Sequence, residues 1–368
     1  MTIDRDHLRG NLRALVDGTT ALRHDGRFDE PNLDGSAGDY ISFHSWEWPQ
    51  GVALYGLVRL WMQSGDPALQ RLIEDWYAAR IAEGLPALNI NTTAPMLALS
   101  LLWRETRDPR WEPVLRDWAD RVVAEAPRTV EGAFQHDVSD RLNHHELWDD
   151  TLFMAALFLA VYGSAARRDD LVDEAIGQFL VHARYLADRS TGLWFHGWTF
   201  EGRHNFAQAR WARGNAWITA AVLDLLEFSE VPRAVERHLL GILNAQVEAL
   251  LRCQAASGAW HTLLDDPSSY QEISATAGFG YGLLKGARLG VGDERWRSAG
   301  MKALGAVLVN IENGTVQNVS YGTRMGHDLE FYRNIPIQPT GYGQALAILC
   351  LGEGLHHATP AGPAKELS

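Results

Sequence analysis

The chain has 368 residues, of which 46% are hydrophobic and 21% are charged, so it can build a sizeable core and has the composition of an ordinary soluble globular protein. Its net charge of −13 argues against nucleic acid as a partner, because nucleic-acid-binding proteins present basic surfaces. The fourteen tryptophans are unusual: flat rings in that number suit a sugar-binding cleft, although Trp is also a common core residue.

Three features of the sequence bear on cellular location. The first ten residues, "MTIDRDHLRG", are charged where a signal peptide would be apolar. No apolar run reaches the length of a membrane span. Cys253 and Cys350 both fall within apolar helical patterns, which favours buried free thiols in a reducing compartment. We therefore expect a cytoplasmic protein.

Helical periodicity is strong along the whole chain, and strand signals are weak. The breaks coincide with clear stop signals, such as "SGDPA" after the second helix and "SEVPR" between the eighth and the ninth. The twelve helices that the pattern predicts cover residues 4–17, 47–64, 67–83, 93–106, 109–126, 148–165, 169–188, 212–229, 232–254, 271–289, 291–310 and 340–353.

Two kinds of helix alternate along this series. One kind is rich in Ala, Gly and Leu and nearly uncharged, as in "TLFMAALFLAVYG", whereas the other carries charges along one face, as in "ALQRLIEDWYAARIA". A helix that is apolar all round must be buried, and an amphipathic helix lies outside it. Six of each predict an all-α fold, an (α/α)6 barrel that forms a single domain over residues 1–355, with a disordered tail at 356–368. The uncharged helices begin near residues 47, 92, 148, 212, 272 and 340.

Five long connections precede buried helices and hold most of the Trp and His, in stretches such as "HSWEWPQG" and "WFHGW". Because each leads into the N-terminal end of a buried helix, we expect them to gather at one mouth of the ring. Long ordered connections are usually functional, so a sugar-sized pocket at that mouth is the leading inference. The connections cover residues 18–46, 127–147, 189–211, 255–270 and 311–339.

Two adjacent acids, Asp149 and Asp150, stand at the start of the buried helix expected at 148–165. A single Asp here is expected as a helix cap, but only one of two neighbours can cap. The helix N-terminus would lower the pKa of such an acid, whereas burial beside Trp148 and the negative charge of Glu146 would raise it. The sequence leaves open which effect prevails; an acid poised between the two suits general acid–base work.

Eight stretches, in order along nearly the whole chain, match one group of enzymes. They are "WEWPQGVALYGL" (46–57), "NTTAPML" (91–97), "GAFQH" (132–136), "LWDDTLFMA" (147–155), "GLWFHGW" (192–198), "RWARGNAW" (210–217), "SGAWHTLLDDPSSYQEISATA" (257–277) and "YGQALAI" (342–348). On these motifs the chain resembles the unsaturated rhamnogalacturonyl hydrolases of glycoside hydrolase family 105, and less closely the unsaturated glucuronyl hydrolases of family 88. The resemblance implies an (α/α)6 barrel, in agreement with the helical pattern, and an enzyme that needs neither metal nor other cofactor.

The reaction that the resemblance implies is the hydration of a double bond. The substrate would be an oligosaccharide left by a polysaccharide lyase, as in pectin degradation, with a C4=C5 double bond in its non-reducing uronic acid. Asp150, the acid just before "TLFM", would protonate C4 while water adds at C5. The hemiketal would then open to a keto acid and release the neighbouring sugar, such as rhamnose. One carboxyl can serve in both steps, so the carboxylate pair of an ordinary glycosidase is not required.

The chain departs from the family at one place. Several members have a second Asp before the third helix, where this chain has Asn89 and Asn91. An Asn side chain can hold a hydroxyl or a water but cannot titrate. We therefore expect Asp150 to act alone, with Asp149 as a helix cap or a supporting partner.

The other candidate residues depend mainly on the resemblance. Arg213 would pair with the uronate carboxylate, unless it is an Arg salt-bridged at a helix start. Trp211 and Trp217 would stack on the sugar, unless they pack in the core. The remaining predicted binding residues are Trp48, Asn89, Asn91, His136, His196 and Trp198, with His261 and Tyr270 as further, unranked candidates.

A metal site is superficially suggested by His144, His145 and Glu146. Adjacent histidines rarely point at one ion, and no HxxxH spacing supports them, so we expect no metal. Two other functions remain open on the residues alone. Sugar epimerases and isomerases use the same ring fold with catalytic histidines, and a non-catalytic carbohydrate-binding protein would keep the cleft without the chemistry.

Overall fold

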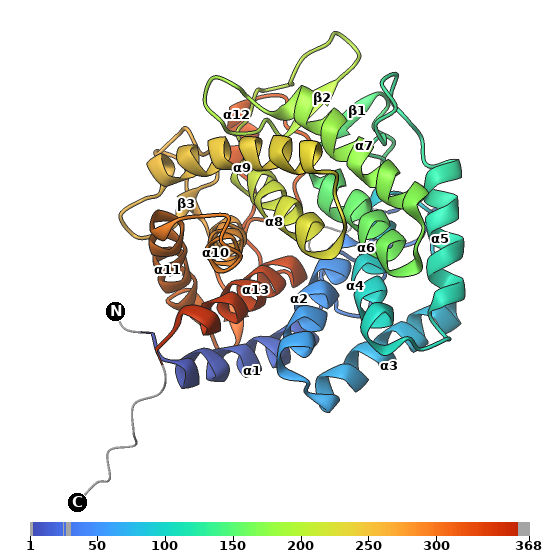
Figure 1. Cartoon of the computed structure of the whole chain (residues 1–368), viewed down its shortest axis with the longest axis horizontal. Coiled ribbons are helices and arrows are strands. Elements are labelled where there is room, and N and C mark those ends of the chain that lie inside the picture. The colour runs from blue at the N-terminus through green and yellow to red at the C-terminus, as the bar shows by residue number, and fades with distance from the viewer. Residues whose placement is uncertain (1–2, 25, 27–30, 360–368) are drawn as a thin grey trace, which may run out of the picture.

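The computed structural model describes residues 3–24, 26 and 31–359, and most of this part is helical. The helices form two concentric rings, with the N-terminal and C-terminal helices side by side where the circle closes (Figure 1). Among the described helices, none has the length and the apolar character that a bilayer span requires.

The inner ring consists of six helices that follow one another round a closed circle. Each packs against the next, and the last packs against the first. These helices are buried all round, as in the fourth helix of the chain, where residues 90–103 are buried without interruption. The inner helices are α2 (Trp48–Ser64), α4 (Ile90–Thr106), α6 (Leu157–Ala166), α8 (Ala212–Phe228), α10 (Ile273–Arg288) and α13 (Gly341–His357).

The outer ring consists of amphipathic helices that bury one face. In the helix over residues 233–253, the buried Leu239, Leu243, Val247 and Leu250 recur at helical spacing. Each outer helix packs mainly on one inner helix: α1 (Arg5–Ala21) on α13, α3 (Pro67–Glu83) on α2, α5 (Glu112–Glu125) on α4, α7 (Asp169–Leu186) on α6, α9 (Arg233–Cys253) on α8, and α11 (Glu294–Leu308) on α10. The predicted (α/α)6 barrel is confirmed.

Two elements differ from the predicted helices. The one expected at 148–165 follows a strand, β1 (Glu146–Trp148), and contains a π-helical turn, η1 (Leu152–Ala156), a rare form that is frequent at functional sites. A short helix, α12 (Leu329–Arg333), lies within the connection expected at 311–339. Five residues are too few to show a helical period, which is why the sequence pattern missed it.

The chain ends differ slightly from the expected tail. Helix α13 continues to His357, so the first residues of the segment expected as a tail at 356–368 are helical. Residues 360–368 of that segment lie outside the described residues.

A short antiparallel strand pair joins two of the long connections. The strand β1 pairs with β2 (Gly197–Thr199), with Trp148 opposite Gly197, and the backbone N–H of Asp149 donates to the carbonyl of His196 at 3.0 Å. This ladder joins two loops that are about fifty residues apart in the sequence. The other two pairs are β3 (Trp260–His261) with β4 (Gln271–Glu272), and β5 (Ile311–Glu312) with β6 (Thr315–Val316).

Candidate active site

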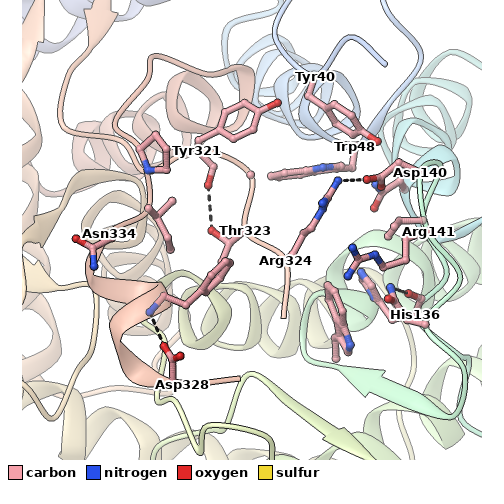
Figure 2. A pocket seen from close by; sticks show the side chains of 18 of the residues that line it. Tyr40, Trp48, His136, Asp140, Arg141, Tyr321, Thr323, Arg324, Asp328 and Asn334 are labelled. Carbon is pink, nitrogen blue, oxygen red and sulfur yellow. Dashed lines mark hydrogen bonds and ion pairs between the residues drawn. The ribbon is translucent and has the colours of Figure 1, made fainter. Parts of the chain in front are cut away.

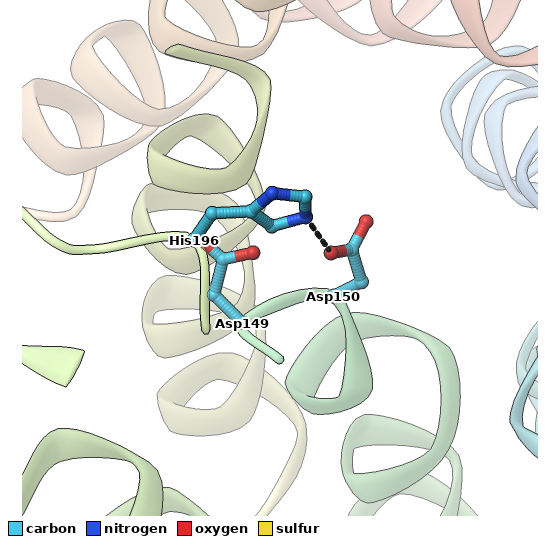
Figure 3. Close-up of side chains that lie close together, drawn as sticks. All are labelled: Asp149, Asp150 and His196. Carbon is cyan, nitrogen blue, oxygen red and sulfur yellow. Dashed lines mark ion pairs between the residues drawn. The ribbon is translucent and has the colours of Figure 1, made fainter. Parts of the chain in front are cut away.

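Three titratable side chains meet where the β1–β2 ladder ends. Asp149, Asp150 and His196 present oxygen and nitrogen atoms that all lie within 4.8 Å of one another. The Nε2 of His196 is 3.3 Å from Oδ2 of Asp150, and Figure 3 shows the imidazole turned toward that carboxylate. The β1–β2 pairing brings these side chains together, because Trp148 lies opposite Gly197 and so places His196 beside Asp149 and Asp150.

The two carboxyls of this cluster have opposite protonation preferences. Burial raises the pKa of Asp149 well above its usual value, and the negative charge of Asp150 raises it further. Burial also acts to raise the pKa of Asp150, but the nearby His196 and the positive charges that His196 and His136 carry as imidazolium ions outweigh it and hold this pKa at about 2. A proton on the pair is therefore held preferentially by Asp149, and Asp150 is the acid that ionises more readily.

Asp149 does not act as the expected helix cap. Its side chain is fully buried, and neither carboxylate oxygen has a hydrogen-bond partner. It packs instead on the first turn of α8, where a Cβ added to Gly214 would lie 2.2 Å from Oδ2 of Asp149. Glycine at 214 thus leaves space for the acid, and Asp149 packs between α8 and Asp150 rather than capping a helix.

A cavity of about 600 Å³ opens beside this cluster. His136 and Trp148 belong to its wall, and they stack on each other with ring centroids 4.4 Å apart. His136 also places its Nδ1 2.8 Å from the hydroxyl of Thr151, next to Asp150. Burial lowers the pKa of His136 to about 4, so this imidazole is neutral near pH 7. Asp150 is not itself a wall residue, and its side chain is 14% exposed.

The rest of the wall comes from three connections and from the starts of α2 and α4. It combines aromatic rings with charged groups, which suits a charged sugar. Figure 2 shows Arg324 between Trp48 and Arg141, ion-paired with Asp140. Besides these four, the wall includes Tyr40, Asn91, Val138, Asn143, Tyr321, Gly322, Thr323, Asp328, Glu330, Phe331, Asn334, Ile335 and Pro336.

The long connections do not all reach the cavity. Those expected at 18–46, 127–147 and 311–339 contribute to its wall, and the one at 189–211 supplies His196. The connection at 255–270 contributes no wall residue; it supports α12 through an ion pair of Asp266 with Arg333 at 2.8 Å.

Arg213 lies where it cannot meet a substrate carboxylate. It is fully buried, and its guanidinium donates to Ser320 O at 2.9 Å and to Thr323 Oγ1 at 2.8 Å, with Glu272 at 3.6 Å. This geometry favours the alternative of a salt-bridged Arg at a helix start over the expected pairing with the uronate. Its position fixes the 320–323 segment, which forms part of the cavity wall. The arginines of that wall are Arg141 and Arg324.

The predicted tryptophans divide between wall and core. Trp48 lies in the wall and stacks on Tyr342 at 4.5 Å. Trp211 and Trp217 are buried, Trp211 against His196 at 4.4 Å, so for both the core alternative holds and stacking on a sugar is not supported. Trp198 packs on Tyr185 and does not reach the wall.

Of the two predicted asparagines, one lies in the cavity wall and the other does not. Asn91 lies in the cavity wall. Asn89 is the N-cap of α4, where its amide oxygen accepts from the backbone N–H of Thr92 at 3.0 Å, and it is absent from the wall. The binding role expected for Asn89 is thus replaced by a capping role. His261 and Tyr270 are likewise not wall residues; the ring of His261 bonds to the carbonyl of Ser269.

The suspected metal ligands do not converge. His144 and His145 are exposed, and Glu146 accepts a hydrogen bond from the indole of Trp148 at 2.8 Å. Among the described residues, the acids and histidines close enough to share an ion are Asp149, Asp150 and His196.

Sequence reasoning missed a buried carboxyl beside the wall. Glu47 precedes Trp48, is 5% exposed, and accepts hydrogen bonds from the hydroxyl of Ser139 and from the backbone N–H of Trp48. Burial raises its pKa to about 7, and the negative charge of Asp140 adds to the effect. The signal was present in "WEWPQG", where an acid stands between two tryptophans of a matched motif. Asp140, Arg141, Arg324 and Tyr332 carried no such signal.

Comparison with known proteins places this geometry in a family context. The family model described as Glycosyl Hydrolase Family 88 matches residues 27–357. The Unsaturated rhamnogalacturonyl hydrolase YesR of Bacillus subtilis (strain 168) is 33% identical over 315 residues, which cover 84% of this chain and 90% of that protein.

Solved structures agree with the sequence relatives. The crystal structure of a possible member of the GH105 family from Salmonella enterica subsp. enterica serovar Paratyphi A superposes with a TM-score of 0.95 at 45% identity, covering 96% of this chain and 95% of that one. The unsaturated glucuronyl hydrolase from Bacillus sp. GL1 has a TM-score of 0.70 at 17% identity over 94% of this chain and 95% of its own, a likeness of fold alone.

Proposed function

The chain belongs to glycosyl hydrolase family 88, and from that premise we propose that it removes an unsaturated uronic acid from the non-reducing end of oligosaccharides by hydrating the C4=C5 double bond. The uronate leaves as a ring-opened keto acid, and the neighbouring sugar is released. The similarity to an unsaturated rhamnogalacturonyl hydrolase supports rhamnose as that neighbour.

The observation that carries the proposal is the position of Asp150. Its carboxylate is held 3.3 Å from His196 by a ladder that joins two loops, next to a cavity of sugar size with aromatic walls. A proton donor to carbon must be placed and screened from bulk water, and Asp150 meets both needs. We propose Asp150 as the catalytic acid.

The reaction needs a proton on Asp150, whereas the free site holds it ionised. A bound substrate changes this, because its own carboxylate is a like charge and its ring displaces water, and both effects raise the pKa of Asp150. Asp149, protonated and within 4.8 Å, is the nearest reserve. We propose that the two acids share one proton, in place of the expectation that Asp150 acts alone.

The steps then balance with one water. Asp150 gives its proton to C4, which leaves positive charge shared by C5 and the ring oxygen. The new carboxylate assists a water that adds to C5. The C5–O5 bond of the hemiketal breaks to give a ketone at C5 and a hydroxyl at C1, and C1 then expels the neighbouring sugar as its aldehyde forms.

The anionic group of the substrate needs a cation, and Arg213 is already engaged by the protein. We propose Arg324, with Arg141 beside it, for this role. Arg324 is 39% exposed and its present partner, Asp140, has a pKa raised mainly by burial. A substrate carboxylate can therefore replace Asp140 at the guanidinium while Asp140 takes up a proton.

A cytoplasmic location is part of the proposal. Cys253 and Cys350 are both within the described residues and both are free thiols, which agrees with a reducing compartment.

One experiment tests the chemistry. The enzyme is given a lyase-generated disaccharide of unsaturated uronate and rhamnose in heavy water, while the ultraviolet absorbance of the double bond and the released sugar are followed. We expect both to change at the same rate and one deuterium to appear at C4. An ordinary glycosidase would release the sugar before the absorbance is lost, because the freed uronate opens to an enol that becomes the ketone only afterwards, and an epimerase or a binding protein would release none; either result overturns the proposal. Galacturonyl and glucuronyl substrates assayed side by side decide the preference.

A further inference from the structure

The second ring nitrogen of His196 faces a residue that the mechanism above does not use. Its Nδ1 is 2.7 Å from the hydroxyl oxygen of Tyr332, whereas its Nε2 faces Asp150 at 3.3 Å. Tyr332 is fully buried, and burial raises the pKa of its phenol, so the hydroxyl keeps its hydrogen. Phenol, imidazole and carboxylate thus follow one another in a chain of three groups.

The hydrogen bonds around the Tyr332 hydroxyl decide its direction. The backbone N–H of Gly326 donates to the phenolic oxygen at 3.1 Å. The one phenolic hydrogen is left for either Nδ1 of His196 at 2.7 Å or the sulfur of Met325 at 3.6 Å. Sulfur is a weak acceptor, so the hydrogen goes to Nδ1. A neutral imidazole that accepts at Nδ1 carries its hydrogen on Nε2, the nitrogen that faces Asp150.

We propose that Tyr332 is a positioning residue that fixes His196 as the Nε2–H tautomer and thereby holds the Asp150 carboxylate for the hydration reaction. This inference rests on the proposed function, because it assigns Tyr332 a part in that reaction. With the opposite tautomer, the lone pair on Nε2 would face the carboxylate and repel it. Tyr332 prevents this by occupying Nδ1 as a donor.

The fold holds Tyr332 firmly in this place. It lies on α12, whose start is capped by Asp328 accepting from the backbone N–H of Phe331 at 2.8 Å, and whose end is tied to Asp266 through Arg333. The Tyr332 ring belongs to a small buried cluster with Ala209, Trp211, Leu263 and Ile335.

The ring of His196 is held equally well. Trp211 lies 4.4 Å from it and Trp148 5.5 Å, both measured between ring centroids. Because Phe331 on the same short helix belongs to the cavity wall, α12 contacts the substrate cavity on one side and His196 on the other. A hydroxyl aimed at an imidazole from such a rigid support is suited to set a tautomer.

The test compares Tyr332→Phe with Tyr77→Phe. Each removes one buried hydroxyl, and the hydroxyl of Tyr77 donates to the carbonyl of Pro95 at 2.6 Å, outside the acid cluster and the cavity wall. We expect kcat of Tyr332→Phe to fall about 10- to 100-fold with KM unchanged, the usual effect of losing the partner that orients a functional histidine. Tyr77→Phe should keep both constants.

A spectroscopic measurement accompanies the kinetics. In protein labelled with ¹⁵N in histidine, the His196 signals are identified by their absence from His196→Asn. They should show hydrogen on Nε2 and none on Nδ1 in the wild type and in Tyr77→Phe, and a mixture of tautomers in Tyr332→Phe. Wild-type signals with hydrogen on Nδ1, whether the ring is neutral or doubly protonated, would overturn the inference, and so would a kcat of Tyr332→Phe equal to that of Tyr77→Phe. If the wild type fails to hydrate unsaturated disaccharides, the proposed function fails, while the ¹⁵N spectra still decide the tautomer.

Discussion

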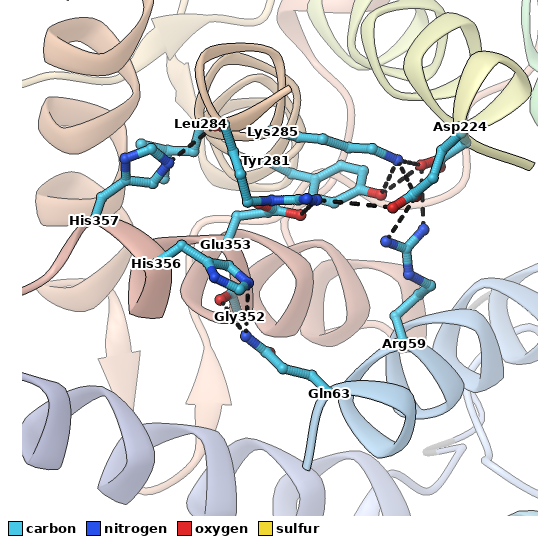
Figure 4. A network of polar contacts seen from close by, with 12 residues as sticks. Arg59, Gln63, Asp224, Tyr281, Leu284, Lys285, Gly352, Glu353, His356 and His357 are labelled. Atoms are coloured by element: carbon cyan, nitrogen blue, oxygen red, sulfur yellow. Dashed lines mark hydrogen bonds and ion pairs between the residues drawn. The ribbon is translucent and has the colours of Figure 1, made fainter. Parts of the chain in front are cut away.

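Two groups of buried charged side chains lie near opposite ends of the inner helix α8. The acid cluster of Asp149, Asp150 and His196 lies at the first turn of α8, whereas Asp224 lies about ten residues further along the same helix, or roughly 15 Å. Around Asp224 the hydroxyls of Tyr55 and Tyr281 donate at 2.6 and 2.5 Å, and Lys285 and Arg59 supply positive charge (Figure 4). We call this second group, Asp224 with Tyr55, Tyr281, Lys285 and Arg59, the ion-pair cluster.

The two clusters differ in how their charges are compensated. In the ion-pair cluster, burial acts to raise the pKa of Asp224, but the positive charges of Lys285 and Arg59 outweigh it and the pKa is lowered. Asp224 therefore stays ionised, with its charge compensated by these cations. In the acid cluster Asp149 has no hydrogen-bond partner and stays neutral instead. Removing one partner of a paired buried charge is strongly destabilising, whereas buried acids left without partners are characteristic of sites that move protons.

The comparison is tested most strongly at Asp150. Replacing Asp150 with Asn should lower kcat about 10³- to 10⁴-fold, because the proton for C4 is lost, as judged by the absorbance assay. The free energy of unfolding should fall modestly, because the lowered pKa of Asp150 means that folding favours its ionised form, which Asn cannot adopt. A loss of stability with activity retained would mean that Asp150 is structural.

A substitution in the ion-pair cluster should have the opposite pattern of effects, lowering stability strongly and leaving activity unchanged. In Lys285→Met, the buried Asp224 and the partly exposed Glu227 lose a cation, and we expect the free energy of unfolding to fall by about 3–5 kcal/mol in urea titrations. The activity of the molecules that remain folded should be close to that of the wild type. Lys302→Met, at an exposed lysine of α11, is the matched control and should change neither quantity.

A substitution of Arg324 in the cavity wall should affect substrate binding alone. Replacing Arg324 with Met should raise KM about 10- to 100-fold, because a hydrogen-bonded charge pair with the substrate is lost. With a substrate whose uronate is a methyl ester, the wild type and Arg324→Met should have similar KM values. A KM ratio that persists with the ester would remove Arg324 from carboxylate recognition.

The smallest expected effect is a slope of stability with pH. Asp149 has a folded-state pKa well above its unfolded value of about 3.9, so the stability that it contributes is present at low pH and is lost as pH rises toward the folded pKa. Asn at this position stays neutral. The free energy of unfolding of Asp149→Asn should therefore rise relative to that of the wild type as pH rises, by at most about 1.4 kcal/mol per pH unit.

Asp224→Asn is the contrasting variant for that slope. The lowered pKa of Asp224 means that its contribution is present above its unfolded pKa and is lost only as pH falls through the folded value. Urea unfolding at several pH values should give opposite trends for the two variants. Parallel trends would show that the two clusters are not distinguished by their charge compensation.

The architecture could be predicted from the sequence because it depends on local repetition. Residues such as Leu8, Leu12 and Leu15 recur at helical spacing, which marks an amphipathic helix, and a helix that is apolar all round must be buried. Asp150 was found because a motif marks it, and the mouth of the ring was found because the long connections lead there. The wall position of Trp48 followed from the same motif match.

The sequence by itself determined the ring of helices and the acid that stands before Thr151. Only the tertiary structure decided which acid of the pair keeps a proton, that Arg213 supports the wall while Arg324 belongs to it, and that Tyr332 reaches His196 from 136 residues away. The reason is physical. Helical periodicity is read from neighbours three and four residues apart, whereas burial, ion pairing and the direction of a hydrogen bond depend on loops that meet only after the ring has closed.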